Sequence, residues 1–160
     1  MACVHADFLS KETGDMGLLD EVVPYYDDSS ATVMEHIKQA LNFLESNKGS
    51  HGLILIKYGD WNDSLTAVGK EGRGESVWLS EAYAEAMLQM AELAAYLGDK
   101  KGRNDYTNRR ECIIKAINGN AWDGKWYARC FDDNGRPIGS NLNEQGKIFM
   151  EAQSWALIYS

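Results

Sequence analysis

The sequence predicts an all-α fold, an array of helix hairpins into which one small β-hairpin is inserted. Helical patterns cover residues 32–46, 76–97, 101–118 and 148–159. In the first of them, apolar residues recur every three or four positions, the spacing of an amphipathic helix. The period changes between Trp122 and Ser140, where an aromatic stretch leads into Asn134-Gly135, the strongest short hairpin signal. We expect residues 1–160 to form one unit.

The other elements follow from local signals. Residues 1–13 are compatible with a helix that ends at Gly14. Pro24 disfavours helical geometry for the residue before it, so a loop is expected around it. Residues 51–57, which read His-Gly-Leu-Ile-Leu-Ile-Lys, are expected to form a short buried element. Alanine, leucine, methionine and glutamate fill the longest helical pattern, which Gly98 ends.

Composition narrows the class of protein. Apolar residues make up 44% and charged residues 25% of the chain, which are ordinary values for a globular domain. The formal net charge of -8 and the lack of a basic stripe argue against nucleic-acid binding. No apolar run is long enough to span a membrane, and no signal core is present. Three widely spaced cysteines and scattered histidines indicate reduced thiols, a cytoplasmic protein and no metal site.

The densest group of polar functional side chains is Gly59-Asp60-Trp61-Asn62-Asp63, which lies between the buried element and a glycine-rich loop. Carboxylates supply acid/base chemistry or charged hydrogen bonds, and a tryptophan face can stack on a sugar ring. The alternative is a structural turn in which Asp60, Asn62 and Asp63 bond nearby backbone groups.

Two neighbouring features allow both a functional and a structural interpretation. Lys57, Lys70 and Arg73 place positive charge around the acidic motif, where an anionic co-substrate could be held or where the charges simply balance. Glu75 and Ser76 stand at the start of the longest helix, where a cap is favoured over a role in substrate binding.

Several motifs together resemble one family. They are Gly59-Asp-Trp-Asn-Asp63, Gly72-Arg-Gly-Glu-Ser-Val-Trp-Leu79, Ala121-Trp-Asp-Gly-Lys-Trp-Tyr-Ala-Arg129, Asp133-Asn-Gly-Arg-Pro-Ile-Gly-Ser140 and Gln153-Ser-Trp-Ala156. In this order, and over nearly the whole chain, they resemble the inverting phosphorylases of the cellobiose phosphorylase family, glycoside hydrolase family 94.

The resemblance implies a fold and a reaction. Family members have an (α/α)6 toroid as catalytic domain and are several times longer, so the chain would be a fragment of that domain. Phosphate attacks the anomeric carbon of a β-glucoside with inversion, while one carboxylic acid protonates the departing oxygen. By the family pattern this acid is Asp63, whose pKa must then lie above the ordinary value of about 3.9. Because phosphate is already a nucleophile, no second carboxylate is needed to activate water.

The resemblance also assigns binding residues. Trp61 would stack on the sugar, and Asp60 and Asn62 would hold hydroxyls or shape the loop. Gln153 matches a glutamine that contacts the sugar, and Arg73 is a candidate for the neighbourhood of phosphate or sugar. The phosphate-binding histidine and a Thr-Gly pair of the family would lie beyond Ser160. Inorganic phosphate is the co-substrate, and no organic cofactor is implied.

Substrate and assembly remain less defined. The residues that flank the motif, Leu53 to Tyr58 and Ser64 to Thr66, are more similar to the 1,2-β-oligoglucan phosphorylase branch than to cellobiose-acting members. Two other functions stay open, an inverting glycoside hydrolase and a non-catalytic carbohydrate-binding or structural piece. The family also suggests a homodimer for the full-length protein.

Overall fold

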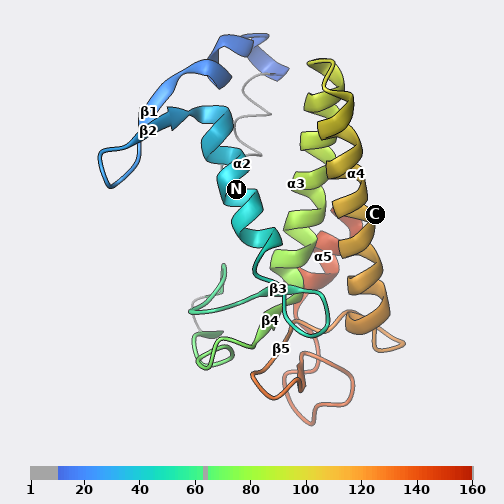
Figure 1. The fold of residues 1–160 in the computed structure, drawn as a ribbon. Coiled ribbons are helices and arrows are strands. Elements are labelled where there is room, and N and C mark those ends of the chain that lie inside the picture. Colours follow the sequence, from blue (N-terminus) through green and yellow to red (C-terminus); the bar gives the residue numbers. More distant parts are fainter. Residues whose placement is uncertain (1–10, 63–64, 160) are drawn as a thin grey trace.

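The computed structural model describes residues 11–62 and 65–159, which form a helical body with two small antiparallel sheets (Figure 1). The helical elements are the 3-10 helix η1 (Met16–Asp20), α2 (Val33–Glu45), α3 (Val77–Tyr96), α4 (Lys100–Ala116), the π-helical turn η3 (Ile117–Ala121) and α5 (Met150–Tyr159). The strands are β1 (Val22–Pro24), β2 (Ser30–Thr32), β3 (Ile54–Leu55), β4 (Glu75–Ser76), β5 (Cys130–Phe131) and β6 (Pro137–Ile138).

Helix α3 forms the centre of the core. It is apolar around most of its circumference, as expected for a helix covered on several sides. Helix α4 lies beside it along most of its length, α5 packs against it, and α2 contributes Ile37 and Leu41 to the same core. Tyr83 and Met87 of α3 and Ile113 of α4 are almost fully buried there.

Side-chain caps fix the helix ends. Thr32 and Glu35 form a reciprocal capping box at the start of α2. The Ser76 hydroxyl accepts the Leu79 N–H at 3.0 Å and so caps α3. Gly98, with a φ of 76°, ends this helix in a conformation that favours glycine. The helices predicted for residues 32–46, 76–97, 101–118 and 148–159 are all confirmed, with ends shifted by one or two residues.

The prediction of an all-α fold with one inserted hairpin was wrong about the extent of β structure. The predicted hairpin is present as β5 and β6, but it extends into a four-stranded antiparallel sheet of order β3-β4-β5-β6. Ile54 pairs with Ser76, and Ser76 pairs with Cys130. A second hairpin, β1 and β2, lies where a loop was expected. Strands of two or three residues carry too little alternation to be recognised from sequence.

The long loops gather at one end of the molecule. The four-stranded sheet lies at the lower end of α3 in Figure 1, where the chain enters this helix, and the loops at 56–74 and 122–148 extend from that end. The β1–β2 hairpin lies toward the other end of α2. Of the helix predicted for residues 1–13, residues 1–10 lie outside the described part of the chain. Within residues 11–62 and 65–159, no helix combines the length and apolarity needed to cross a membrane.

Candidate active site

The loop between β3 and β4, residues 56–74, is folded over a small core of its own. Ile56 and Val68 of the loop are buried together with Cys130 of β5. The Ile56 N–H donates to the Gly74 carbonyl at 2.8 Å, so the loop is closed where it leaves and rejoins the sheet. Gly59, with a φ of 146°, takes a conformation that other residues rarely adopt. The candidate motif therefore starts from a defined backbone position.

Asp60 points into the protein and is held by three donors. Its Oδ1 accepts from Arg129 Nη2 at 2.6 Å and from the Asn62 N–H at 3.0 Å, and its Oδ2 accepts from the Ser76 hydroxyl at 2.6 Å. The Asn62 bond is that of an Asx turn, the structural alternative foreseen for this motif. In this structure Asp60 shapes the loop, and a contact with a sugar hydroxyl stays a prediction.

The Asp60–Arg129 pair is an ion pair removed from solvent. Neither side chain has any exposed surface. Burial by itself raises the pKa of the Asp60 carboxyl, but hydrogen bonds from Arg129, Ser76 and the Asn62 N–H outweigh it and hold the pKa below 3.8. Asp60 is therefore ionised at neutral pH and cannot act as a general acid there.

Trp61, the next residue of the motif, turns outward. The Trp61 side chain is 66% exposed, so the described part of the chain leaves its ring accessible to a ligand. Asn62 is half-buried, and its carbonyl accepts the Leu65 N–H at 3.0 Å. Asp63, the acid expected from the family pattern, lies outside the described residues, as does Ser64. The roles of Trp61, Asn62 and Asp63 in binding or catalysis stay predictions.

The glycine-rich loop is docked on a single carboxylate. Asp133, in the turn between β5 and β6, accepts the backbone N–H groups of Glu71 at 2.9 Å, Arg73 at 2.8 Å and Gly74 at 3.0 Å. The hydrogen bond from the Glu71 N–H lowers the pKa of Asp133 the most, and the Arg73 and Gly74 N–H groups add to this against the opposing effect of burial. The hairpin and the glycine-rich loop are thus one connected unit.

Arg73 takes part in this contact and is otherwise exposed. Its Nε donates to the Asp133 carbonyl at 2.9 Å, and its guanidinium pairs with Glu71. The side chain is 59% exposed. Lys57 lies over the ring of Phe43, 5.7 Å from its centre. A contact of Arg73 with phosphate or sugar stays a prediction.

Gln153 is engaged within the protein. Its Oε1 accepts the Tyr127 N–H at 3.0 Å, and its Nε2 donates to the Tyr127 carbonyl at 2.7 Å and to the Phe149 carbonyl at 3.2 Å. The two bonds to the Tyr127 backbone resemble those between paired strands. They hold α5 against the segment that leads into β5. A sugar would have to compete with these bonds, and the sugar contact of Gln153 stays a prediction.

Glu75 and His51 form a second buried polar contact. Glu75 is almost fully buried and accepts the backbone N–H groups of His51 and Leu53, at 3.1 and 3.2 Å, while the His51 ring pairs with its carboxylate. The His51 ring also stacks on Phe131, with 4.3 Å between ring centres. Glu75 therefore anchors the segment before β3, and of the predicted cap pair only Ser76 caps the helix.

Glu81 is a buried acid on the central helix. It lies on α3, has no exposed surface, and neither carboxylate oxygen has a hydrogen-bond partner among the described residues. Burial raises the pKa of Glu81 to about 9, although the positive charge of Arg129 opposes the rise. The side chain is therefore neutral at pH 7.

Sequence reasoning missed the roles of Arg129, Glu75 and Glu81. Arg129 lies between Ala128 and Cys130, and an arginine within an apolar strand is a signal that a buried partner is needed. Glu81 gave no comparable signal, because glutamate is common in helices.

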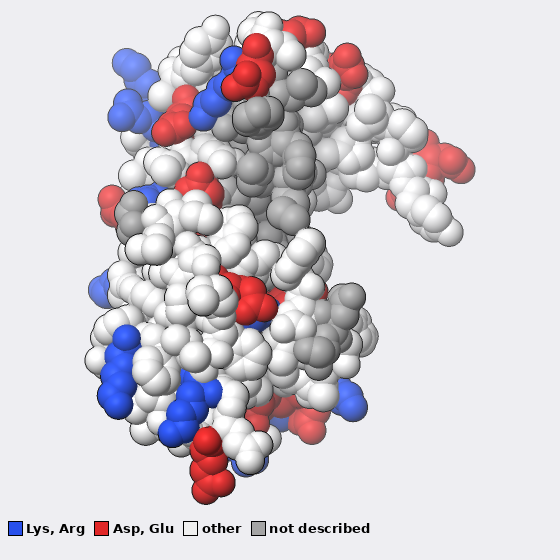
Figure 2. Space-filling model, turned by 180° about the vertical axis from the view of Figure 1, so that it is seen from behind, with Lys and Arg blue, Asp and Glu red and all other residues white. Residues whose placement is uncertain are grey.

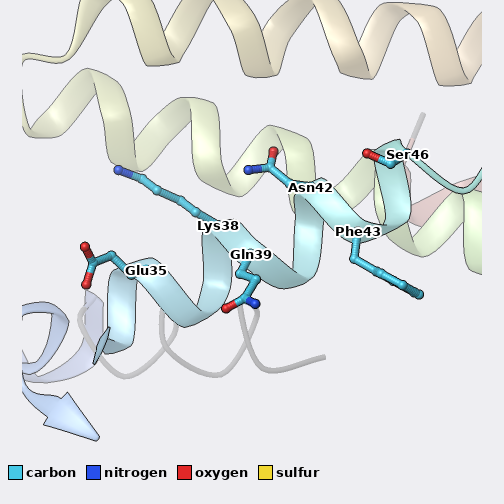
Figure 3. Close-up of a pocket in the computed structure, with 6 residues that line it drawn as sticks. All are labelled: Glu35, Lys38, Gln39, Asn42, Phe43 and Ser46. Carbon is cyan, nitrogen blue, oxygen red and sulfur yellow. The ribbon is translucent and has the colours of Figure 1, made fainter. Parts of the chain in front are cut away.

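The described surface also has a depression and a distribution of charge away from this loop end. A shallow depression on α2 is lined by Glu35, Lys38, Gln39, Asn42, Phe43 and Ser46 (Figure 3). Five of the six belong to this helix and Ser46 is the residue that follows its end, so none comes from the loops at the sheet end. On the face shown in Figure 2, which is hollowed at mid-height, the described basic side chains are interspersed with acidic ones and form no continuous stripe. Among residues 11–62 and 65–159, no group of three or more His, Cys, Asp and Glu side chains could hold a metal ion.

Comparison with known proteins places this chain in a family. Residues 4–160 match the family model described as glycosyl hydrolase 94 superfamily, catalytic domain. A solabiose phosphorylase of Paenibacillus borealis is 40% identical over 149 residues, which are 92% of this chain and 19% of that protein. A 3-O-beta-D-glucopyranosyl-beta-D-glucuronide phosphorylase of the same organism is 36% identical over 157 residues, 98% of this chain and 20% of that protein.

A third relative, a cellobionic acid phosphorylase of Neurospora crassa, is 32% identical over 147 residues, 92% of this chain and 19% of that protein. The chain thus spans about a fifth of the length of the curated relatives that it matches. The family match covers nearly every residue, including the Asp60 loop and the β5–β6 hairpin. The chain belongs to the glycosyl hydrolase 94 superfamily, and the part of that family it matches is the catalytic domain.

Proposed function

We propose that the protein carrying this chain is a glycoside phosphorylase, which cleaves a β-glycosidic bond with inorganic phosphate and inverts the anomeric configuration. The observation that carries the proposal is the family match over residues 4–160, with three relatives that are each named as phosphorylases. Trp61 is exposed, and its loop is anchored to the protein by the contact of Asp60 with Arg129. An exposed tryptophan on an anchored loop is consistent with a sugar-binding surface.

In the proposed mechanism, Asp63 donates the proton to the departing glycosidic oxygen while phosphate attacks the anomeric carbon from the opposite face. The bond between this carbon and the glycosidic oxygen breaks, a carbon–oxygen bond to phosphate forms, and the Asp63 proton ends on the released sugar. Asp60 cannot supply this proton, because its low pKa keeps it ionised. Trp61 stacks on the sugar, and Asn62, Gln153 and Arg73 line the site if their present contacts rearrange.

The substrate is a β-linked glucoside in this proposal, with 1,2-β-oligoglucans as the first choice and cellobiose-like disaccharides as the second. The three relatives carry the names of different disaccharides, so membership of the family does not select one. The complete catalytic domain is proposed to be an (α/α)6 toroid, to which the adjacent helices α3 and α4 contribute one pair. A cytoplasmic location and a homodimer belong to the same proposal.

The test is phosphate-dependent turnover by the longest natural polypeptide that contains this chain. It is incubated with 1,2-β-glucans, cellobiose, solabiose and glucosyl glucuronide, each with and without phosphate, and sugar 1-phosphate is measured. Release of sugar 1-phosphate only when phosphate is present supports the proposal. Equal release of free reducing sugar without phosphate would identify a hydrolase, and sugar binding without any turnover would identify a binding protein.

Asp63 is tested in the same assay. We expect Asp63→Asn to lower kcat by at least about 100-fold, the usual scale for losing a general acid, with sugar affinity nearly unchanged. Asp28→Asn is the matched control, because Asp28 is exposed in the β1–β2 turn, away from the loop end, and has a φ of 64° that asparagine tolerates. Near-normal turnover by Asp63→Asn would remove Asp63 as the acid.

A further inference from the structure

We propose that Arg129 is a positioning residue, which through its ion pair with Asp60 sets the orientation of Trp61. The consequence of this positioning for catalysis rests on the function proposed above. The orientation of the Trp61 ring can be measured without any turnover.

Arg129 is a rigid and permanently charged anchor. Its backbone N–H donates to the Ile138 carbonyl at 2.8 Å, and its carbonyl accepts the Val77 N–H at 3.2 Å, so the sheet and the start of α3 fix its backbone. Its side chain has no exposed surface. A guanidinium does not lose its proton in a protein, so this buried charge requires an anion. Asp60 is the anion it pairs with, at 2.6 Å.

The same oxygen of Asp60 connects this anchor to Trp61. Oδ1 accepts from Arg129 and also from the Asn62 N–H at 3.0 Å, which closes a turn with Trp61 at its centre. Tyr58 and Trp61, which flank Asp60, are 91% and 66% exposed, so the described residues 11–62 and 65–159 give neither side chain a core to pack in. The backbone of Trp61 is therefore fixed through the carboxylate that Arg129 holds.

A buried ion pair could instead serve stability alone, and the two roles predict different results. Loss of one partner leaves an unpaired buried charge and destabilises the whole protein. We therefore choose the double variant Asp60→Asn/Arg129→Met, which removes both charges together. A purely structural role predicts that the environment of Trp61 stays the same or that all parts of the protein change together. A positioning role predicts a change in environment that is confined to the Trp61 loop.

The first readout is 19F NMR of the longest natural polypeptide that contains this chain, labelled with 5-fluorotryptophan. The Trp61 signal is assigned by its loss in Trp61→Phe. Trp122 and Trp155, which lie in other ring contacts, serve as internal references. We expect the double variant to shift and narrow the Trp61 signal and to leave the references in place. An unmoved Trp61 signal, or equal shifts of all the signals, would overturn the proposal.

The second readout is turnover with saturating phosphate. Since a misplacement of about 1 Å can cost about 100-fold in rate, we expect the double variant to lose about this factor in kcat/KM. Arg129→Lys, which keeps the charge without the planar fork, should lose less. Ile113→Val is the control for stability, because Ile113 is buried in α4 away from the loop. Equal losses in the control and in the double variant would contradict a positioning role.

If Trp61 moves in the double variant but the wild-type protein has no phosphorolytic activity, the positioning of Trp61 stands and the proposed function fails. If the wild-type protein is active and Trp61 stays in place, the proposed function stands and the positioning role fails.

Discussion

Glu81 should make the folded protein less stable as pH rises, and Glu81→Gln should remove this effect. The carboxyl is fully buried without a hydrogen-bond partner among the described residues, and its pKa is about 9 in the folded state against 4.5 as the ordinary value. The folded protein therefore holds this proton between pH 4.5 and about 9, whereas the unfolded chain releases it. Because the folded state binds more protons in this window, stability falls as pH rises through it.

The size of the effect follows from the same two values. In a rigid protein, the difference at pH 8 would be about 5 kcal/mol, because each pH unit of the window corresponds to about 1.4 kcal/mol. Rearrangement and water penetration around a buried carboxylate reduce such penalties, so we expect Glu81→Gln to gain at least about 2 kcal/mol over wild type at pH 8. At pH 4.5 the two proteins should agree within about 1 kcal/mol, since Glu81 is then protonated in the folded state.

The assay is urea unfolding of wild type and variant at pH 4.5 and pH 8. Taking the difference between the two proteins cancels the titration of Asp60 and Asp133, which both proteins share. Glu92→Gln, at an exposed position of the same helix, is the matched control and should stay within about 0.5 kcal/mol of wild type. An equal effect of Glu81→Gln at both pH values, or a loss of stability at pH 8, would refute the assignment of a neutral buried Glu81.

Three further substitutions test individual contacts. Ser76→Ala should destabilise the protein by about 1–2 kcal/mol in urea unfolding, because α3 loses its cap and Asp60 one of its donors; an unchanged midpoint would contradict this. Asp133→Ala should speed tryptic cleavage after Lys70 and Arg73, since three backbone N–H groups lose their acceptor, whereas Asp28→Asn should not; equal cleavage rates would show that the loop is held by other contacts. Trp61→Ala should weaken sugar binding by roughly 1–3 kcal/mol in calorimetry and leave unfolding unchanged, and an unaltered affinity would remove Trp61 from the site.

The helices were predictable because their signals are local. Periodic apolar residues, Gly98 at a helix end and Asn134-Gly135 at a hairpin each act within a few positions of the chain. The four-stranded sheet was not predictable in this way, because its strands of two residues are defined by partners far away in sequence, such as Ile54 with Ser76 and Ser76 with Cys130.

The candidate site shows the same division. The motif at residues 59–63 stood out as a cluster of functional side chains, and the family resemblance is confirmed by the match over residues 4–160. The network beneath it depends on Arg129, 69 positions from Asp60 in the sequence, and a pairing at that separation leaves no local pattern. Gln153 stood out in the sequence because it matches a sugar-contacting glutamine of the family. In the structure its side chain bonds the backbone of Tyr127, a contact that the sequence did not predict.

The most direct test of the central claim is the anomeric form of the first product. The longest natural polypeptide that contains this chain is mixed with its best β-glucoside and excess phosphate, and proton NMR follows the anomeric signal during the first turnovers. Inverting phosphorolysis predicts α-glucose 1-phosphate or the α-1-phosphate of the corresponding sugar, formed in step with loss of the β-linkage. A β-1-phosphate, or free sugar released at a rate independent of phosphate, would contradict the account.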